Sequence, residues 1–395
     1  MQPLSVETAK QVIRGLDAIC QVRPTAELLK DLSACYFTLG DVEKSLPLAE
    51  AAWRKNKQAD IGMNLALVLK ELGRHKESTQ VVEQAYWLDP GDMYVRMGYG
   101  EALLKAGLWK QAWSIYDNCR PSQQGAAHHL LLPRAVQEWN GEPLPDGHEL
   151  LVINEGGAGD RLSYPRWLPE LDKKGVNWKF YPYAELFSFF ERVFPREKLV
   201  ADGEQINATH WCTAFSLPAK LDIGPHEVPD PLPITAKPES VEKYKMTRIG
   251  LPIVGLCYAA REDHQGGRKF RSLSEGQAMR LVCMTGDKIQ WVNLQHGENL
   301  PYPVSNLPFH TWDDTAGLIA NLDAVVTVDT SILHLAGAMG KPVACLLAGN
   351  SCWKYLRTGK KLKWYPSATF YRNETRGFEG AISELISAIR NGSAW

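Results

Sequence analysis

The chain has 395 residues, of which 45% are apolar and 23% charged, and its 44 Lys and Arg against 45 Asp and Glu leave a formal net charge of −1. These proportions fit a globular protein of two or three domains, and the balanced charge excludes a global field that would draw it to nucleic acid or to an anionic membrane. The eight cysteines show no metal-ligand spacing, and no segment has the length and hydropathy of a signal peptide or a membrane span, so we expect free thiols and a cytoplasmic protein.

Residues 1–126 are predicted to be helical and repetitive. Gly40, Gly73 and Gly107 fall 33 and 34 residues apart, and small residues such as Ala52 and Ala85 follow at equivalent positions. This pattern resembles the tetratricopeptide repeat (TPR), whose period is about 34 residues. The resemblance implies a capping helix and three helix pairs, at Val6–Cys20, 26–59, 60–92 and 93–126. A stack of this kind offers a groove for a protein partner or an acceptor, or else serves only as a scaffold that extends or dimerises the protein.

Residues 127–148 are predicted to be a linker without a helix, because glycines and prolines punctuate them. A buried strand at Leu150–Asn154 then leads into a glycine turn, Gly156, Gly157 and Gly159, followed by Asp160 and a helix. Such a turn lets the backbone approach a ligand at the edge of an open α/β sheet. It is neither a dinucleotide fingerprint nor a P-loop.

Two α/β lobes are expected after the linker, at 149–235 and 236–395. In the first lobe we expect further strands at Asn177–Tyr183 and Lys198–Ala201 around a helix at Ala184–Phe194, whereas Trp211–Leu217 is ambiguous. The proline-rich segment 222–238 reads as an interdomain connection. In the second lobe we expect strands and helices in alternation, at Ile253–Tyr258, Ser274–Met284, Ile289–Leu294, Thr315–Asn321, Ala324–Val328 and Ile332–Met339. A further strand between Gly340 and Gly349 completes the βαβ unit of residues 321–349, and a closing helix is expected at Phe378–Arg390.

The turn Asp329-Thr330-Ser331 joins the strand Ala324–Val328 to the helix Ile332–Met339. Its hydroxyls and backbone N–H groups stand at a helix N-terminus, where the helix dipole favours an anion such as a phosphate. His334 lies one turn further along the same helix face. The competing interpretation is that Asp329 and Thr330 cap the helix and that His334 is a packed core residue.

Two α/β lobes with such turns suit the transfer of a sugar from a nucleotide sugar. The attacking acceptor hydroxyl must lose a proton, which a carboxylate opposite the leaving group can take. A helix N-terminus with Arg, Lys and His can stabilise the leaving diphosphate without a metal.

Residues 139–372 resemble glycosyltransferase family nine, the heptosyltransferase-like family with the GT-B fold, in the form that carries TPR repeats. The resemblance rests on an ordered set of motifs: WNGEPL (139–144), EGGAGDRLSYPRWLP (155–169), RSL (271–273), VNLQHG (292–297), DDTAGLIANLDAVVTVDTSILHLAGAMGKPV (313–343) and WYPSATFYR (364–372). It implies a glycosyltransferase with an acceptor lobe at 149–235 and a donor lobe at 236–395.

The family's site residues are carried over onto matching positions. Asp160 corresponds to the candidate general base. The donor site corresponds to Asp329, Thr330, Ser331 and His334. Arg271 matches a basic position suited to the diphosphate, with Lys269 or Arg268 assisting, and Gln295 and His296 are weaker contacts. In the loop after Leu347, Trp353 and Arg357 stand where relatives carry Trp and Arg.

Simpler interpretations of these residues stay open. Asp160 would serve equally well as a helix N-cap, Arg271 as a surface charge and Glu155 as a solvated neighbour.

We therefore expect an inverting glycosyltransferase without a metal or other cofactor, which takes a nucleotide sugar as co-substrate. Its acceptor would be a glycan, a protein or a nucleic acid. The alternatives are a non-catalytic TPR adaptor with a degenerate nucleotide-sugar domain, and a transferase that acts on nucleic acid through the basic run 357–363. The sequence leaves the sugar and the nucleotide open.

Overall fold

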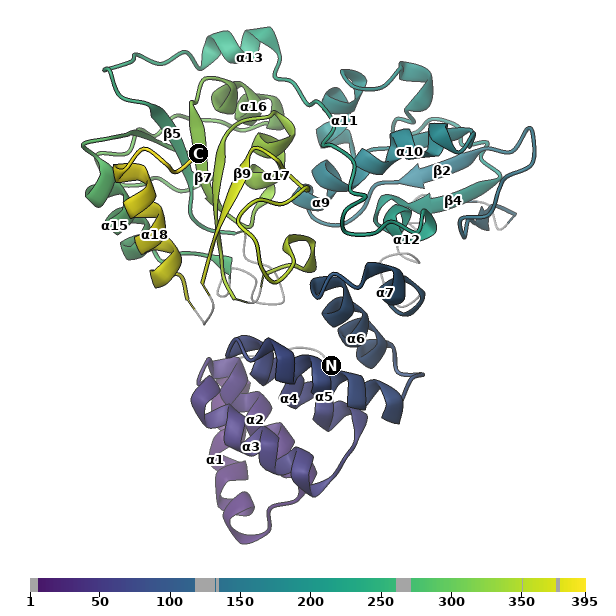
Figure 1. The fold of residues 1–395 in the computed structure, drawn as a ribbon, viewed down its shortest axis with the longest axis vertical. Coiled ribbons are helices and arrows are strands. Elements are labelled where there is room, and N and C mark those ends of the chain that lie inside the picture. The colour runs from purple at the N-terminus through teal and green to yellow at the C-terminus, as the bar shows by residue number, and fades with distance from the viewer. Residues whose placement is uncertain (1–5, 118–131, 133–134, 261–270, 350, 374–376) are drawn as a thin grey trace.

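The computed structural model describes residues 6–117, 132, 135–260, 271–349, 351–373 and 377–395 (Figure 1). A helical array (purple to dark blue) lies on one side of two α/β lobes, an N-terminal lobe in teal and a C-terminal lobe in green and yellow. The last helices of the array, α6 and α7, lie nearest to the lobes. Among the described residues, no helix has both the length and the apolar character that crossing a membrane requires.

The helical array confirms the predicted all-α N-terminal domain. Each predicted repeat contains one pair of helices, and the glycines Gly40, Gly73 and Gly107 adopt φ of 82°, 75° and 83° between the helices of each pair. This left-handed conformation ends a helix at little cost only for glycine. The helices of the array are α1 (Val6–Val22), α2 (Ala26–Leu39), α3 (Val42–Lys55), α4 (Ala59–Glu71), α5 (His75–Leu88), α6 (Met93–Lys105) and α7 (Trp109–Tyr116).

The N-terminal lobe is built on a parallel sheet with the strand order β1-β4-β2-β3. The chain runs from β2 outward to β3 and then returns to the other side of β2 as β4, so the order of connection reverses between β2 and β4. The strands are β1 (Gln137–Glu138), β2 (Leu150–Ile153), β3 (Trp178–Tyr181) and β4 (His210–Thr213). Its helical segments are α9 (Ala158–Ser163), η2 (Tyr164–Trp167), α10 (Leu168–Lys173), α11 (Ala184–Glu191), η3 (Arg196–Lys198), η4 (Ala214–Ser216) and α12 (Leu217–Lys220).

The C-terminal lobe has a parallel sheet with the order β6-β5-β7-β8-β9, which reverses between β5 and β7. Ligands of open α/β sheets bind at the carboxyl ends of strands at such a reversal. The strands are β5 (Ile253–Cys257), β6 (Gln290–Asn293), β7 (Ala324–Val328), β8 (Val343–Leu347) and β9 (Ala368–Arg372). The helical segments are α13 (Pro238–Lys243), α15 (Glu275–Thr285), α16 (Trp312–Ala320), α17 (Ser331–Ala338), η5 (Trp353–Tyr355) and α18 (Glu379–Arg390).

Two sequence-based expectations for the N-terminal lobe are wrong. The segment Lys198–Ala201 is not a strand, because it meets the sheet through a single bridge between Phe180 and Leu199 after the short helix η3. The segment 127–148 is more than a linker, since Gln137–Glu138 pairs with β4 as the edge strand β1. A two-residue strand made of Gln and Glu carries no hydrophobic alternation, so its sequence gives no strand signal.

The hydrophobic core is divided unevenly along the helical array. The first two repeats enclose a cluster of their own, which includes Leu29, Trp53 and Leu65. In contrast, Leu103, Trp109 and Trp113 of the third repeat belong to the same core as both α/β lobes. The third repeat therefore packs as part of the α/β body.

Candidate active site

Each sheet has one point at which its strand order reverses. The helices that follow the inner strands at these two points contact each other. In the N-terminal lobe, α9 follows β2, and in the C-terminal lobe, α17 follows β7. These two helices pack directly against each other. The glycine turn (Gly156–Asp160) and the turn Asp329–Ser331, called the hydroxyl turn below, therefore lie together between the lobes.

The hydroxyl turn is fixed by hydrogen bonds at the N-terminus of α17. Thr330 is the N-cap residue, and its Oγ1 accepts from the backbone N–H of Ile332 at 3.3 Å and lies 3.0 Å from Thr327 Oγ1. Ser331 begins the helix and is half-buried. Asp329 is buried, and its Oδ1 accepts from the hydroxyl of Tyr355 at 2.7 Å. Thr330 thus does cap the helix, as one interpretation of the sequence assumed, whereas the Asp329 carboxylate accepts a hydrogen bond from Tyr355.

His334 lies behind this turn and is 3% exposed. Its Nδ1 is 2.9 Å from the hydroxyl of Tyr365, and its Nε2 is 3.4 Å from that of Tyr355. Burial, with the nearby cations Lys354 and Arg166, lowers the pKa of His334 well below its ordinary value. A neutral imidazole between two tyrosines orients the turn and brings no positive charge to it.

The glycine turn allows the lobes to approach closely. Gly156 has φ +83°, and a Cβ there would meet the ring of Phe215 at 2.6 Å. A Cβ on Gly159 would lie 2.6 Å from Cδ2 of His334 and 3.4 Å from the Cα of Ser331. Any side chain at Gly159 would therefore push α9 away from the start of α17.

Asp160 is not a helix N-cap, because α9 begins after Gly157 and Asp160 lies in its first turn. Its Oδ1 accepts from the ammonium of Lys354 at 2.8 Å, and its side chain is 31% exposed. The ion pair joins the N-terminal lobe to the loop that follows β8.

Lys354 is the main site residue that the sequence reasoning missed. It belongs to η5, its side chain is 4% exposed, and its ammonium lies over the rings of Tyr164 and Trp364 at 5.3 and 5.8 Å. Burial acts to lower the pKa of Lys354, but Asp160, Cys352 and Asp329 together outweigh it and raise the pKa above its ordinary value. The sequence carries a signal for it only in the run WKYL at 353–356, in which the resemblance points to Trp353 and not to Lys354.

Arg166 supports the same junction from inside the N-terminal lobe. It is 2% exposed, donates to the carbonyl of Trp364 at 2.6 Å and to that of Ser163 at 2.9 Å, and lies against the rings of Trp364 and Tyr365. Glu155, at the end of β2, is 4% exposed and so is not the solvated neighbour that one interpretation assumed. Long-range packing buries both residues, which their positions in the sequence could not indicate.

The other predicted donor-site residues are distributed around β5 and β6. Gln295 Oε1 accepts from the backbone N–H of Ala259 at 3.0 Å and lies 3.6 Å from Cys257 Sγ, which is 3.7 Å from Thr330 Oγ1. Gln295 therefore reaches the hydroxyl turn through Cys257. Arg271 is half-buried and has interaction partners, His296 is exposed, and Lys269 and Arg268 lie outside the described residues.

Trp353 and Arg357 contact the helical repeats. The ring of Trp353 packs on those of Trp109 and Trp113, with centroids 5.1 and 5.9 Å apart, and Arg357 donates to Thr79 Oγ1. The cations of the basic run 357–363 bind different parts of the protein, since Lys360 pairs with Glu384 and Lys363 donates to the carbonyl of His226. Trp353 and Arg357 therefore do not lie in the donor site. The residues of the basic run do not form a continuous basic patch.

No cluster of three or more His, Cys, Asp or Glu side chains within the described part of the chain is arranged to hold a metal ion. The charged groups that meet between the lobes are Asp160, Asp329, Lys354 and Arg166. The arrangement thus places one partly exposed carboxylate beside a helix N-terminus.

Residues 291–359 match the model of glycosyltransferase family 9 (heptosyltransferase). The C-terminal lobe carries a glycosyltransferase family 9 segment. This segment contains Gln295, the whole hydroxyl turn, His334 and Lys354, and it confirms the family resemblance seen in the sequence.

Individual proteins also resemble the chain. Protein FlbA of Caulobacter vibrioides is 25% identical in an alignment 334 residues long that covers 74% of this chain and 54% of FlbA, so the chain spans about half the length of this curated relative. The structure of E. coli ADP-heptose lipopolysaccharide heptosyltransferase II is similar with a TM-score of 0.38 and 13% identity, covering 62% of this chain and 100% of that one. The crystal structure of MamA is similar with a TM-score of 0.27 and 20% identity, covering 28% of this chain and 67% of MamA.

Proposed function

We propose that the protein transfers a sugar from a nucleotide sugar to an acceptor hydroxyl, with inversion at the anomeric carbon and without a metal. The observation that supports this proposal most is the meeting of Asp160 and the start of α17 between the lobes. A general base and a site for a leaving diphosphate are the two elements that such a transfer needs.

In the proposed reaction Asp160 acts as the base. Lys354 holds its Oδ1, while Oδ2 faces the glycine turn, 3.8 Å from where a Cβ of Gly157 would lie. The acceptor hydroxyl attacks the anomeric carbon on the face opposite the diphosphate, the bond from that carbon to the phosphate oxygen breaks, and the proton passes to Asp160. Displacement from the opposite face inverts the configuration.

The leaving diphosphate would bind at the N-terminus of α17, where the positive end of the helix dipole favours an anion. Asp329, Thr330, Ser331 and Gln295 would shape this site, and Arg271 would add charge. His334 would hold the turn in place as a neutral group, since burial lowers its pKa. In this scheme the protein supplies the stabilisation for which other transferases use a metal, so a chelator should not lower the rate.

The helical repeats would receive the acceptor or a protein partner. The first repeat and α1 border an open surface hollow of about 510 Å³, whose lining includes the cations Lys10, Arg14 and Lys44, the ring of Tyr36 and a single carboxylate, Asp41. Such a lining suits a polar or acidic segment of a protein or glycan.

The test is product formation from a panel of nucleotide sugars, after donors have been selected by thermal shift. We expect Asp160→Asn to lower kcat by about 10²- to 10⁴-fold, the usual contribution of a general base, while the donor still stabilises the protein. Asp172→Asn, at an exposed carboxylate of the same lobe, is the matched control. An Asp160→Asn variant with the wild-type rate would exclude this role.

A non-catalytic adaptor gives a different result in the same assays. Nucleotide sugars would then raise the melting temperature of the wild-type protein, yet no donor would yield product or be hydrolysed. Adding EDTA to an active preparation tests the metal-free scheme separately, and inversion is read from the anomeric configuration of the product.

A further inference from the structure

We propose that Lys105, in the third helical repeat, is a positioning residue of the transferase, which fixes the segment 351–357 so that Lys354 reaches Asp160. This inference rests on the proposed function, because it assigns a role in the same site. It also assigns the third repeat to the catalytic unit rather than to the surface that recognises partners.

Lys105 is a buried cation held by the loop. It ends α6, is 5% exposed, and its ammonium donates to the carbonyl of Ser351 and, at 3.4 Å, to that of Gly349. A buried ammonium is costly unless its hydrogen bonds are satisfied. The two carbonyls just beyond β8 satisfy it, so the position of the loop depends on the position of α6.

Aromatic packing reinforces the same contact next to Lys354. Trp353 is 5% exposed and packs edge-to-face on Trp109, with ring centroids 5.1 Å apart and an interplanar angle of 89°. The ring of Trp364, which lies under the Lys354 ammonium, is 6.1 Å from that of Trp353. The third repeat therefore supports one face of the segment that carries Lys354.

The C-terminal lobe holds the other end of the loop. Arg372, at the end of β9, donates to the carbonyls of Tyr355, Leu356 and Gly359. Leu356 has φ +53°, a left-handed conformation that residues other than glycine adopt only when their surroundings impose it. Held at both ends, the loop presents Lys354 to Asp160 at 2.8 Å.

The division of the core agrees with this role. Leu104, Trp109 and Trp113 share one hydrophobic cluster with both lobes, whereas the first two repeats have a separate cluster. Lys30 in α2 provides a matched comparison because it is also a largely buried cation of the array, with a side chain that is 17% exposed, but its partner is Asp60 of α4 at 2.8 Å.

The test is a double-mutant cycle in the full-length chain, with Lys105→Met, Lys354→Met and the double variant. If Lys105 acts through Lys354, Lys105→Met lowers kcat at least about tenfold with little change in the KM for the donor, and the double variant is no slower than Lys354→Met alone. Lys30→Met, which removes a cation of the first repeat, keeps the wild-type kcat. Circular dichroism and thermal melts verify that each variant is folded.

Two outcomes would overturn the proposal: a wild-type kcat in Lys105→Met, or losses that multiply in the double variant. If Lys105→Met does not fold, the milder Lys105→Gln, which keeps an N–H donor, is carried through the same cycle. A wild-type protein that forms no product with any donor overturns the proposed function itself. That result is distinct from an active wild type that tolerates Lys105→Met.

Discussion

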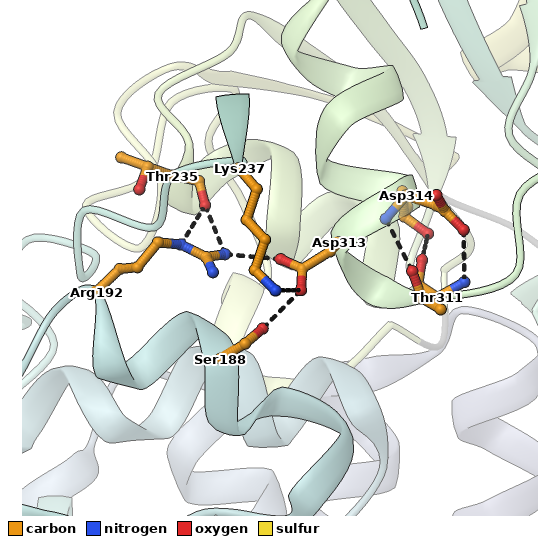
Figure 2. Close-up of polar contacts among 8 residues, drawn as sticks. Ser188, Arg192, Thr235, Lys237, Thr311, Asp313 and Asp314 are labelled. Carbon is orange, nitrogen blue, oxygen red and sulfur yellow. Dashed lines mark hydrogen bonds and ion pairs between the residues drawn. The ribbon is translucent and has the colours of Figure 1, made fainter. Parts of the chain in front are cut away.

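The contact between α9 and α17 and the contact between α11 and α16 both join the N-terminal lobe to the C-terminal lobe, with different chemistry. At the first contact, Gly159 lies against His334 with no room for a side chain. At the second, Asp313 accepts from Ser188 at 2.8 Å, from Arg192 at 2.9 Å and from Lys237 at 2.9 Å (Figure 2). The Asp313 side chain is 19% exposed, whereas His334 is 3% exposed.

The difference indicates which contact fixes the site. Close packing around a buried imidazole tolerates little displacement, because interiors are packed as densely as crystals. Ion pairs that retain contact with water are weak and can rearrange. We therefore expect the contact between α9 and α17 to set the geometry of catalysis, and the contact at Asp313 to add modest stability.

Among changes to the packing of these two contacts, the largest effect is expected from Gly159→Ala. The new Cβ would lie 2.6 Å from His334 Cδ2, and overpacking of this kind costs about 1–3 kcal/mol of unfolding free energy. Because α9 also carries Asp160, transfer should fall by at least about tenfold. Gly276→Ala, at an exposed glycine at the start of α15, is the control, since its Cβ would meet nothing closer than 4.0 Å. Equal stability and activity in the two variants would contradict a tight contact.

A smaller effect is expected from Tyr355→Phe. This change removes the hydroxyl that donates to buried Asp329 at 2.7 Å, and the loss of a hydrogen bond to a charged acceptor costs about 1.5 kcal/mol or more. Chemical denaturation measures the loss. Tyr302→Phe is the control because Tyr302 is 94% exposed, and a variant at Tyr355 that is as stable as this control would show that Asp329 does not depend on Tyr355.

The two contacts should also differ in their response to acid. The pKa of His334 is well below its ordinary value, so the unfolded chain takes up a proton near pH 6.5 before the folded chain does. Stability should fall by up to about 2 kcal/mol as the pH drops from 7 to 5. His334→Gln should lack this component in thermal melts, and His296→Gln, at an exposed histidine, should retain it. A wild-type melt that does not change between pH 7 and 5 would argue against a neutral buried His334.

The smallest effect belongs to Asp313. Burial acts to raise the pKa of Asp313, but Lys237, Ser188 and Arg192 outweigh it and lower the pKa below its ordinary value. Its contribution is therefore present at neutral pH and is lost only as the pH falls below about 4. Asp313→Asn should lower the free energy of unfolding by about 0.5–1 kcal/mol at pH 7. The difference between the variant and the wild type should disappear below about pH 4, as measured by denaturation at several pH values. A cost as large as that of Gly159→Ala would reverse the ranking of the two contacts.

Much of the fold could be read from local patterns. The 33- and 34-residue spacing of Gly40, Gly73 and Gly107 predicted the helix pairs, because only glycine ends a helix cheaply in the left-handed conformation. The β-branched run Ala324–Val328 appears as β7 with the predicted bounds. The edge strand Gln137–Glu138 was missed, since its pairing with β4 leaves no periodic signal in two polar residues.

For the candidate site, the sequence by itself determined the two turns, Gly156–Asp160 and Asp329–Ser331, because glycines after a strand and hydroxyls before a helix are local signals. Only the tertiary structure decided that these turns pack together, that Lys354 pairs with Asp160, and that His334 is buried between two tyrosines. Asp160 and Lys354 are 194 residues apart in the chain. Contacts of that separation depend on how the lobes and the third repeat pack, and no local pattern encodes them.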